Sequence, residues 1–131
     1  MAVSIKQTVT QTGTTSSVNT TFTTTADILP GEDIFIALGR ATQTGHAAGI
    51  SNITTSAGAG TFERVATSIR ASTFDLVLAR LRCTTLIPSG STITAVSRTS
   101  EAKRGGVMQV VSGLKATYTA ANASSGNAAD N

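Results

Sequence analysis

The sequence predicts an all-β protein, an antiparallel β-sandwich of the jelly-roll kind with flexible terminal arms. Three observations lead to this prediction. The 131 residues include 24 Thr, a β-branched residue that suits a pleated, half-exposed surface and disfavours helix interiors. Short apolar or alternating segments are separated by turn residues roughly every 8–12 positions, which is typical of sandwiches and barrels. No segment has the spacing of an amphipathic helix, so we expect helix content below about 10%, against an average near 30%.

Length and composition fit one domain with an aliphatic core. Hydrophobic residues make up 40% of the chain but aromatic residues only 4%, and Trp is absent. The net charge is +3, yet the basic residues are scattered, so we expect no nucleic-acid partner. No apolar stretch approaches the ~18 residues of a transmembrane helix, and no signal-peptide pattern opens the chain, so we expect no membrane partner either.

Residues 1–27 are predicted to form an N-terminal arm or edge strands. Strand-like segments at Val3–Thr10 and Thr20–Ala26 alternate Thr with other residues and contain few apolar groups. Such strands are templates for pairing with another chain. We therefore expect Ala2–Thr25 to contact a neighbouring subunit, and a chain without residues 1–20 to keep a folded core.

Residues 28–115 are predicted to form the β-sandwich core. The turn Ile28–Asp33 leads into the continuous apolar run Ile34–Leu38, which is typical of a central strand. A polar, Gly-rich loop at 39–49 then precedes a short strand at Ile50–Thr55.

The second half of this core begins with a segment at Thr61–Ile69 and continues with three strands, at Thr73–Cys83, Ser91–Ser97 and Val107–Leu114. In the first of these strands apolar side chains alternate onto both faces. One set contains Phe74, Leu76 and Leu78 and is continued by two arginines toward its solvated end. We assign this set to the core, so the predicted core-facing residues include Ile34, Ile36, Phe74, Leu76, Leu78, Val107 and Val111.

Two turn segments have similar sequences. Ile28–Ile34 and Leu86–Ile93 each contain an apolar pair, then Pro, then Gly, then the start of a strand. Either they begin equivalent strands in two Greek-key halves of a jelly roll, or two ordinary turns coincide. After the core, residues 116–131 are rich in Ala, Asn, Ser and Gly and are predicted to form a flexible C-terminal tail, which with the N-terminal segment contacts neighbouring subunits.

No combination of residues indicates catalysis. His46 is the only histidine, and no Gly-x-Ser-x-Gly motif presents a nucleophile, so we expect a solvated His46 and no enzyme activity. Asp27, Glu32 and Asp33 lack the densely spaced oxygens of a calcium loop, and carboxylates beside a surface turn are the usual finding. Cys83 lies in an apolar run and is expected to be a buried small residue. We expect no catalytic, metal-binding or cofactor-binding residues.

A series of turns and strands over about residues 25–114 has a familiar order: Leu29–Ile36, Ser56–Phe62, Leu76–Arg80, Pro88–Thr94 and Val111–Leu114. This order resembles the jelly-roll virion proteins of tailed bacteriophages, which include capsid decoration (cement) proteins and related tail modules. The resemblance implies a shell component without a cofactor, often a trimer or packed between capsid subunits.

Two functional hypotheses follow. The first is a virion structural protein, most simply a capsid decoration protein that stabilises the shell through contacts with the major capsid protein or other virion subunits. It would be a homo-oligomer such as a trimer, located in the virion after synthesis in the host cytoplasm. The alternative is a tail or adhesin-type β-sandwich module that recognises a glycan or a host surface. The side chains that we expect to contact a partner are Val3, Ile5, Val18, Phe22 and Tyr118.

Overall fold

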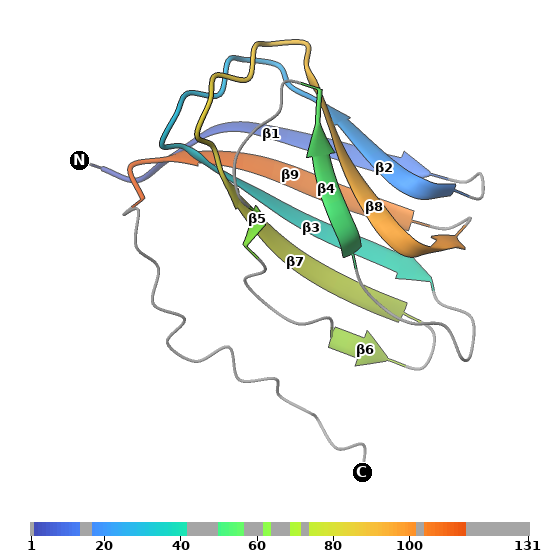
Figure 1. The fold of residues 1–131 in the computed structure, drawn as a ribbon. Coiled ribbons are helices and arrows are strands. Elements are labelled where there is room, and N and C mark those ends of the chain that lie inside the picture. The colour runs from blue at the N-terminus through green and yellow to red at the C-terminus, as the bar shows by residue number, and fades with distance from the viewer. Residues whose placement is uncertain are drawn as a thin grey trace.

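The computed structural model shows two antiparallel β-sheets packed face to face (Figure 1). It describes residues 2–13, 17–41, 50–56, 62–63, 69–71, 74–101 and 104–114. These segments are strands, turns and short connections, and they contain no helix. The all-β sandwich predicted from the Thr-rich, alternating sequence is therefore confirmed.

The larger sheet contains four long strands. Its order is β1 (Ser4–Gly13), β9 (Arg104–Ser112), β3 (Asp33–Ala41) and β7 (Phe74–Arg82). Two short strands, β5 (Phe62–Glu63) and β6 (Ile69–Ala71), both pair with the outer edge of β7. The central position of β3 agrees with its continuous apolar sequence, because both of its faces are shielded to some degree.

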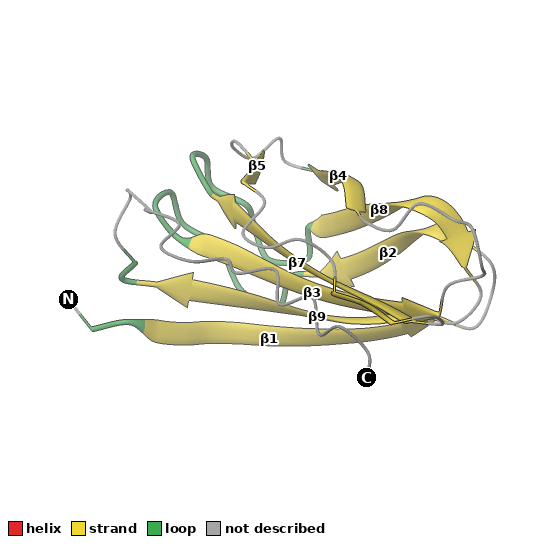
Figure 2. Cartoon of the chain, turned by 90° about the horizontal axis from the view of Figure 1, so that it is seen from below, coloured by secondary structure: helices red, strands yellow, loops and turns green. Residues whose placement is uncertain are grey.

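The smaller sheet contains three strands and covers one face of the larger sheet (Figure 2). Its order is β2 (Ser17–Thr23), β8 (Thr92–Glu101) and β4 (Ile50–Thr55). All of its pairings are antiparallel, and both of them have a register shift near one end of β8.

The order of the long strands is that of a jelly roll. The first strand lies beside the last and the second beside the last but one, as β1 pairs with β9 and β2 with β8. Strands β3 and β4 lie on the other sides of β9 and β8, because β3 pairs with β9 and β4 pairs with β8. Chain segments therefore alternate between the two sheets, which is the nesting of two Greek keys.

The two similar turn segments lie side by side at one end of the sandwich. Ile28 and Ile87 form an antiparallel bridge, with hydrogen bonds of 2.8 and 2.9 Å between their backbones, and both side chains are fully buried. Gly31 and Gly90 have φ values of 90° and 81°, which glycine adopts without strain. One turn carries the chain from β2 to β3 and the other from β7 to β8, so each crosses between sheets. This arrangement supports the first interpretation, that the segments are equivalent in two Greek-key halves.

The core between the sheets consists mainly of aliphatic side chains. Ile34 and Ile36 are buried there as predicted. The prediction was wrong for β7, where Leu78 is 41% exposed and Leu76 is half-buried. The side chain of Phe74 lies outside the described residues. The residues of β7 that face the core are Val77, Ala79 and Leu81.

Strand β9 differs from the prediction in the same way. Met108 and Val110 are fully buried in the core, whereas Val107 is half-buried on the opposite face. Val111 is buried, but it belongs to that opposite face, opposite Asp33 and Ile5. In both strands each alternate set of side chains is largely apolar, so alternation alone does not identify the inner face.

The N-terminal segment is part of the sandwich, so of the two forms predicted for residues 1–27, an arm or edge strands, the structure shows edge strands. Strand β1 pairs with β9 from Ser4 to Gly13, and β2 pairs with β8. Phe22 of β2 is 0% exposed and belongs to the core. Strands β1 and β2 each stand at one end of the strand order of their sheet. Removal of residues 1–20 would therefore expose β9 rather than leave a complete core.

Candidate binding surface

The two outer faces of the sandwich differ in chemistry. On the smaller sheet, residues of β2, β8 and β4 that point away from the core are mostly hydroxyl and amide side chains. Val96 is the apolar exception on this face. The polar residues of this outer face are Asn19, Thr21, Thr23, Asn52, Thr54, Thr92 and Thr94. It is the solvated face expected of an antiparallel sheet.

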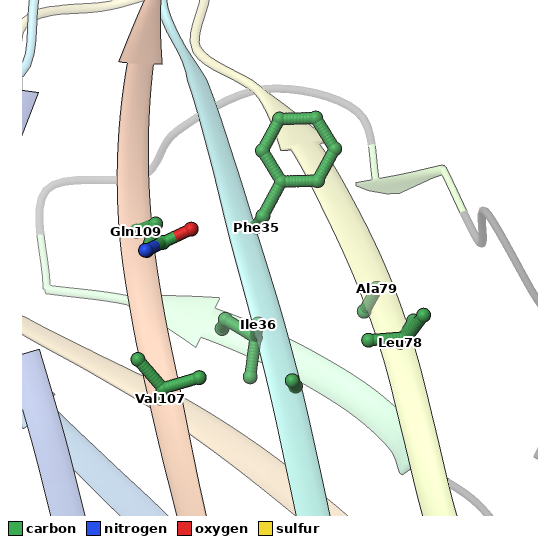
Figure 3. A pocket seen from close by; sticks show the side chains of 7 residues that line it. Phe35, Ile36, Leu78, Ala79, Val107 and Gln109 are labelled. Atoms are coloured by element: carbon green, nitrogen blue, oxygen red, sulfur yellow. The ribbon is translucent and has the colours of Figure 1, made fainter. Parts of the chain in front are cut away.

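The outer face of the larger sheet is apolar at its centre. Phe35 and Ala37 of β3, Leu78 of β7 and Val107 of β9 lie there as neighbours in the register. They border a cavity of about 310 Å³ (Figure 3). The residues that line the cavity are Phe35, Ile36, Ala37, Leu78, Ala79, Val107 and Gln109. We call Phe35, Ala37, Leu78 and Val107 the apolar patch.

Exposed apolar side chains continue this face toward β1. Ile5 is 59% exposed and opposes Val111 of β9, so its side chain lies on the same face as the apolar patch. Val3, just before the strand, is also 59% exposed. The outer face of the larger sheet therefore presents apolar groups from β1 to β7.

A buried ion cluster occupies one end of the same face. Asp33 is 0% exposed and accepts hydrogen bonds from Arg80 Nε at 2.8 Å and from Arg82 Nη1 at 2.6 Å. The Arg80 guanidinium lies 5.9 Å from the centroid of the Phe35 ring, within cation–π range. Arg82 Nη1 also donates to the carbonyl of Leu114 at 3.2 Å. The single Asp33 carboxylate is therefore shared by two guanidinium groups, and one of them, that of Arg80, lies beside the Phe35 ring that lines the cavity.

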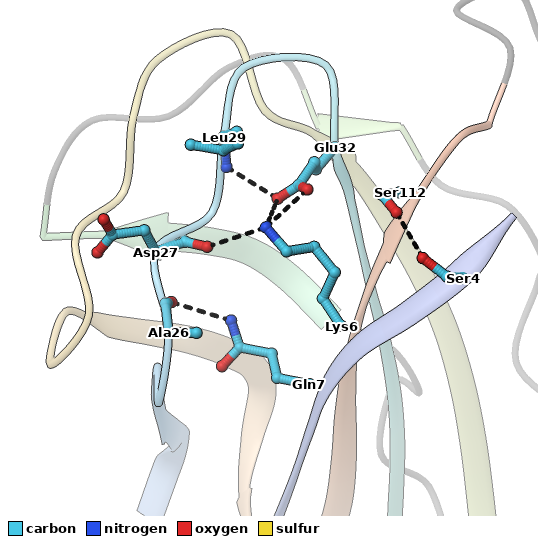
Figure 4. Close-up of polar contacts among 8 residues, drawn as sticks. All are labelled: Ser4, Lys6, Gln7, Ala26, Asp27, Leu29, Glu32 and Ser112. Carbon is cyan, nitrogen blue, oxygen red and sulfur yellow. Dashed lines mark hydrogen bonds and ion pairs between the residues drawn. The ribbon is translucent and has the colours of Figure 1, made fainter. Parts of the chain in front are cut away.

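The other acidic groups near the first turn also make structural contacts (Figure 4). Glu32 pairs with Lys6 at 2.8 Å and accepts a hydrogen bond from Leu29 N at 2.9 Å. Asp27 accepts one from Ser89 N at 2.8 Å, which joins the two similar turns. Of the three acids expected beside a surface turn, Glu32 and Asp33 are buried and only Asp27 is exposed. In the described part of the chain, no cluster of three potential metal ligands occurs.

Gln7 ties β1 to the same region. Its side-chain amide donates to the carbonyl of Ala26 at 3.1 Å (Figure 4). It also accepts a hydrogen bond from Thr25 N at 2.8 Å. Gln7 is buried, so these hydrogen bonds satisfy an amide that would otherwise be costly to remove from water.

Cys83 is buried in the core, as predicted, and its thiol is held in the neutral form. Burial raises the pKa of the Cys83 thiol from 9.0 to about 11, and the nearby Asp33 and Glu32 add to the increase. The folded protein therefore binds the thiol proton more tightly than the unfolded chain does. This contribution to stability is present below pH 9 and decreases as the pH rises from about 9 to 11.

We expect this pH dependence to appear in urea unfolding. Between pH 8 and 11 the wild-type protein should lose more stability than the Cys83→Ala variant, because only the wild type must ionise a thiol on unfolding. The free energies of unfolding of both proteins at several pH values provide the test. Parallel pH profiles would contradict a raised thiol pKa.

The side chains predicted to contact a partner have different environments. Val3, Ile5 and Val18 are exposed, so they are accessible to a partner. Phe22 is buried in the core, so its side chain cannot take that role in the folded chain. Tyr118 and His46 lie outside the described residues.

Sequence reasoning missed the apolar patch. The available signal was the uninterrupted apolar run Ile34–Leu38, which must place apolar side chains on both faces of β3. Only one of those faces packs against the smaller sheet, so the other needs a different cover.

The fold and this surface define a jelly-roll β-sandwich with a polar outer face on the smaller sheet and an apolar patch at the centre of the outer face of the larger sheet. Compared with models of known protein families, with curated proteins and with solved structures, the chain has no match in any of the three. None of the described segments forms a helix that could span a membrane.

Proposed function

We propose that the chain is a virion structural protein, a capsid decoration protein that binds shell subunits through the apolar outer face of its larger sheet. The contrast between the two outer faces carries this proposal. A sheet face that meets water is expected to be polar, as that of the smaller sheet is. The larger sheet instead presents the apolar patch, with Leu78 41% exposed at its edge.

The geometry of the patch supports a protein partner. A cavity of about 310 Å³ with apolar walls fits an aliphatic or aromatic side chain from an opposing surface. Ile5 and Val3 would extend the contact along the sheet, and Thr8 and Thr10 of β1 provide a polar rim.

The glycan-binding alternative has weaker support. Sugar recognition at a surface of this size needs aromatic faces for stacking together with several polar groups. Among the residues lining the cavity, Phe35 is the aromatic one and Gln109 the polar one, and the Phe35 ring already has a guanidinium nearby. A hydrophobic contact with protein uses this surface more fully.

The test is binding of the purified protein to virions that lack it, from the phage whose genome encodes it. We expect Leu78→Asp to weaken co-sedimentation at least about tenfold, because it places a charge where an apolar contact is proposed. Thr21→Asp makes the same charge change at an exposed site on the polar face and should bind as the wild type does. Circular dichroism should show both variants folded.

Two results would overturn the proposal. One is unchanged co-sedimentation of a folded Leu78→Asp variant. The other is absence of the protein from purified wild-type virions. If the wild type binds to a glycan array and Thr21→Asp abolishes that binding, the result would instead favour the alternative function, a module that recognises a glycan.

A further inference from the structure

Strand β1 has one open edge. It pairs with β9 on one side, and within the described ranges no strand pairs with its other side (Figure 2). Natural edge strands are usually protected by charge, proline, bulges or short length. Here β1 has ten residues and no Pro, and its one charged residue, Lys6, is held by Glu32.

The protection is confined to the start of the strand. The register of β1 against β9 shifts between Ile5 and Gln7, which marks a bulge at Lys6. From Gln7 to Gly13 the register is regular. This regular segment has Thr10 at its centre, with Thr at every second position around it.

The hydrogen-bond pattern tells which backbone groups of this segment are open. In an antiparallel ladder, the N–H and C=O groups of successive residues point to opposite sides. Cys83 N donates to Glu32 O at 2.9 Å, so the backbone N–H and C=O groups of Cys83 point toward the segment that leads into β3. Because the direction alternates along a strand, the backbone groups of Leu81, two residues earlier, also point toward β3. Leu81 opposes Ile34, so the backbone N–H and C=O groups of Ile34 point toward β7.

The same alternation then fixes the remaining strands. Because the backbone groups of Ile34 point toward β7, those of its neighbour Phe35 point toward β9, where Phe35 opposes Gln109. Gln109 therefore directs its backbone groups to β3, and the backbone groups of its neighbour Met108 point toward β1, where Met108 opposes Val9. Val9 uses its backbone groups toward β9, so the residues of β1 whose N–H and C=O groups point to the open edge are Thr8, Thr10 and Thr12.

We propose that this edge binds β1 of a second copy of the chain, antiparallel, with the two-fold axis at Thr10. In this register Thr10 faces Thr10 of the second copy, and Thr8 and Thr12 face each other twice. These three Thr residues have outward N–H and C=O groups, so each Thr–Thr pair forms two backbone hydrogen bonds. The same segment serves both copies, as a two-fold interface requires.

The side chains fit this pairing. Thr–Thr pairs across an antiparallel ladder are favourable, and within Thr8–Thr12 no charged residue faces another. The pairing also joins the outer faces of two larger sheets into one surface that holds two apolar patches. Two patches on one rigid unit would strengthen binding to a repeating shell. The dimer itself does not depend on the proposed function.

The test uses the purified full chain and sedimentation velocity over a concentration series. We expect a monomer–dimer equilibrium for the wild type. Thr10→Lys places two like charges at the two-fold axis and should raise the dimer dissociation constant at least tenfold. Thr21→Lys makes the same change at an exposed Thr of the polar face and should leave it unchanged.

Amide hydrogen exchange provides a second readout that does not need a variant. The amides of Thr8, Thr10 and Thr12 should exchange more slowly at high than at low protein concentration. Any of three results would overturn the proposal: a wild type that stays monomeric up to about 1 mM, a Thr10→Lys variant that dimerises as the wild type does, or a dimer in which these amides remain unprotected. A dimer lost in Leu78→Asp but kept in Thr10→Lys would place the interface on the apolar patch instead.

Discussion

Replacement of Asp33 by Asn should lower the free energy of unfolding by about 3 kcal/mol or more. Asp33 is fully buried and is the shared partner of Arg80 and Arg82, at 2.8 and 2.6 Å. Arg80 is itself only 4% exposed. The neutral amide would remove the carboxylate that both guanidinium groups contact inside the fold, and removing one partner of a buried ion pair is strongly destabilising.

The matched control is Asp27→Asn, the same chemical change at an exposed carboxylate. Asp27 accepts one hydrogen bond, from Ser89 N, which an Asn oxygen can also accept, so we expect a loss below about 1 kcal/mol. Thermal unfolding should separate the variants, with a fall of roughly 10 °C or more for Asp33→Asn. Similar melting temperatures for the two would show that the ion cluster contributes little.

Local sequence patterns were sufficient for much of the fold. Alternation and β-branched residues marked the long strands, and a Pro followed within two residues by a Gly marked each of the two turns that cross between the sheets. These features depend on neighbouring residues, for which the physics is local: φ near −65° at Pro, positive φ at Gly, and a pleat that alternates side chains.

The choice of inner face depended on contacts distant in sequence. In β7, both Leu78 and Leu81 belong to apolar sets, so the period of two cannot decide between them. The arginines contained the missing information. Arg80 lies on the same face as Leu78, and its partner Asp33 belongs to β3, 47 residues away in the sequence. Polar partners on one face exclude that face from an apolar core.

The sequence pattern placed the N-terminal strands outside the predicted core for a related reason. Strand β1 contains few apolar residues because only alternate positions, such as Gln7 and Val9, face inward at the edge of the sandwich. Its pairing with β9 joins Ser4 to Ser112, a separation of 108 residues. Low hydrophobicity correctly indicated an edge, but an edge strand can still be held by its backbone hydrogen bonds and one well-packed neighbour.

The candidate surface was predicted only in part. Val3 and Ile5 were proposed from the sequence as partner contacts, and both are exposed; Ile5 lies on the same face as the apolar patch. The patch itself forms only when β9, β3 and β7 come together, so neither Val107 nor Leu78 could be assigned to it from its own strand.

A pair of substitutions in β7 tests the corrected face. Leu81→Ala should lower the free energy of unfolding by about 2–5 kcal/mol, since Leu81 is 2% exposed and its removal leaves a cavity between the sheets. Leu78→Ala removes the same atoms from a side chain that is 41% exposed on the outer face, and it should cost about 1 kcal/mol or less. Both changes occur in one strand and remove the same atoms, so the comparison reports the difference in burial between the two faces of β7.

Urea unfolding of the two variants against the wild type gives both values. The large difference between them should persist at any protein concentration at which the wild type is monomeric. A loss at Leu78 as large as the loss at Leu81 would mean that the chain itself covers the outer face of β7. In that case the apolar patch would be a second core rather than a binding surface, and the proposed contact with shell subunits would have to lie elsewhere.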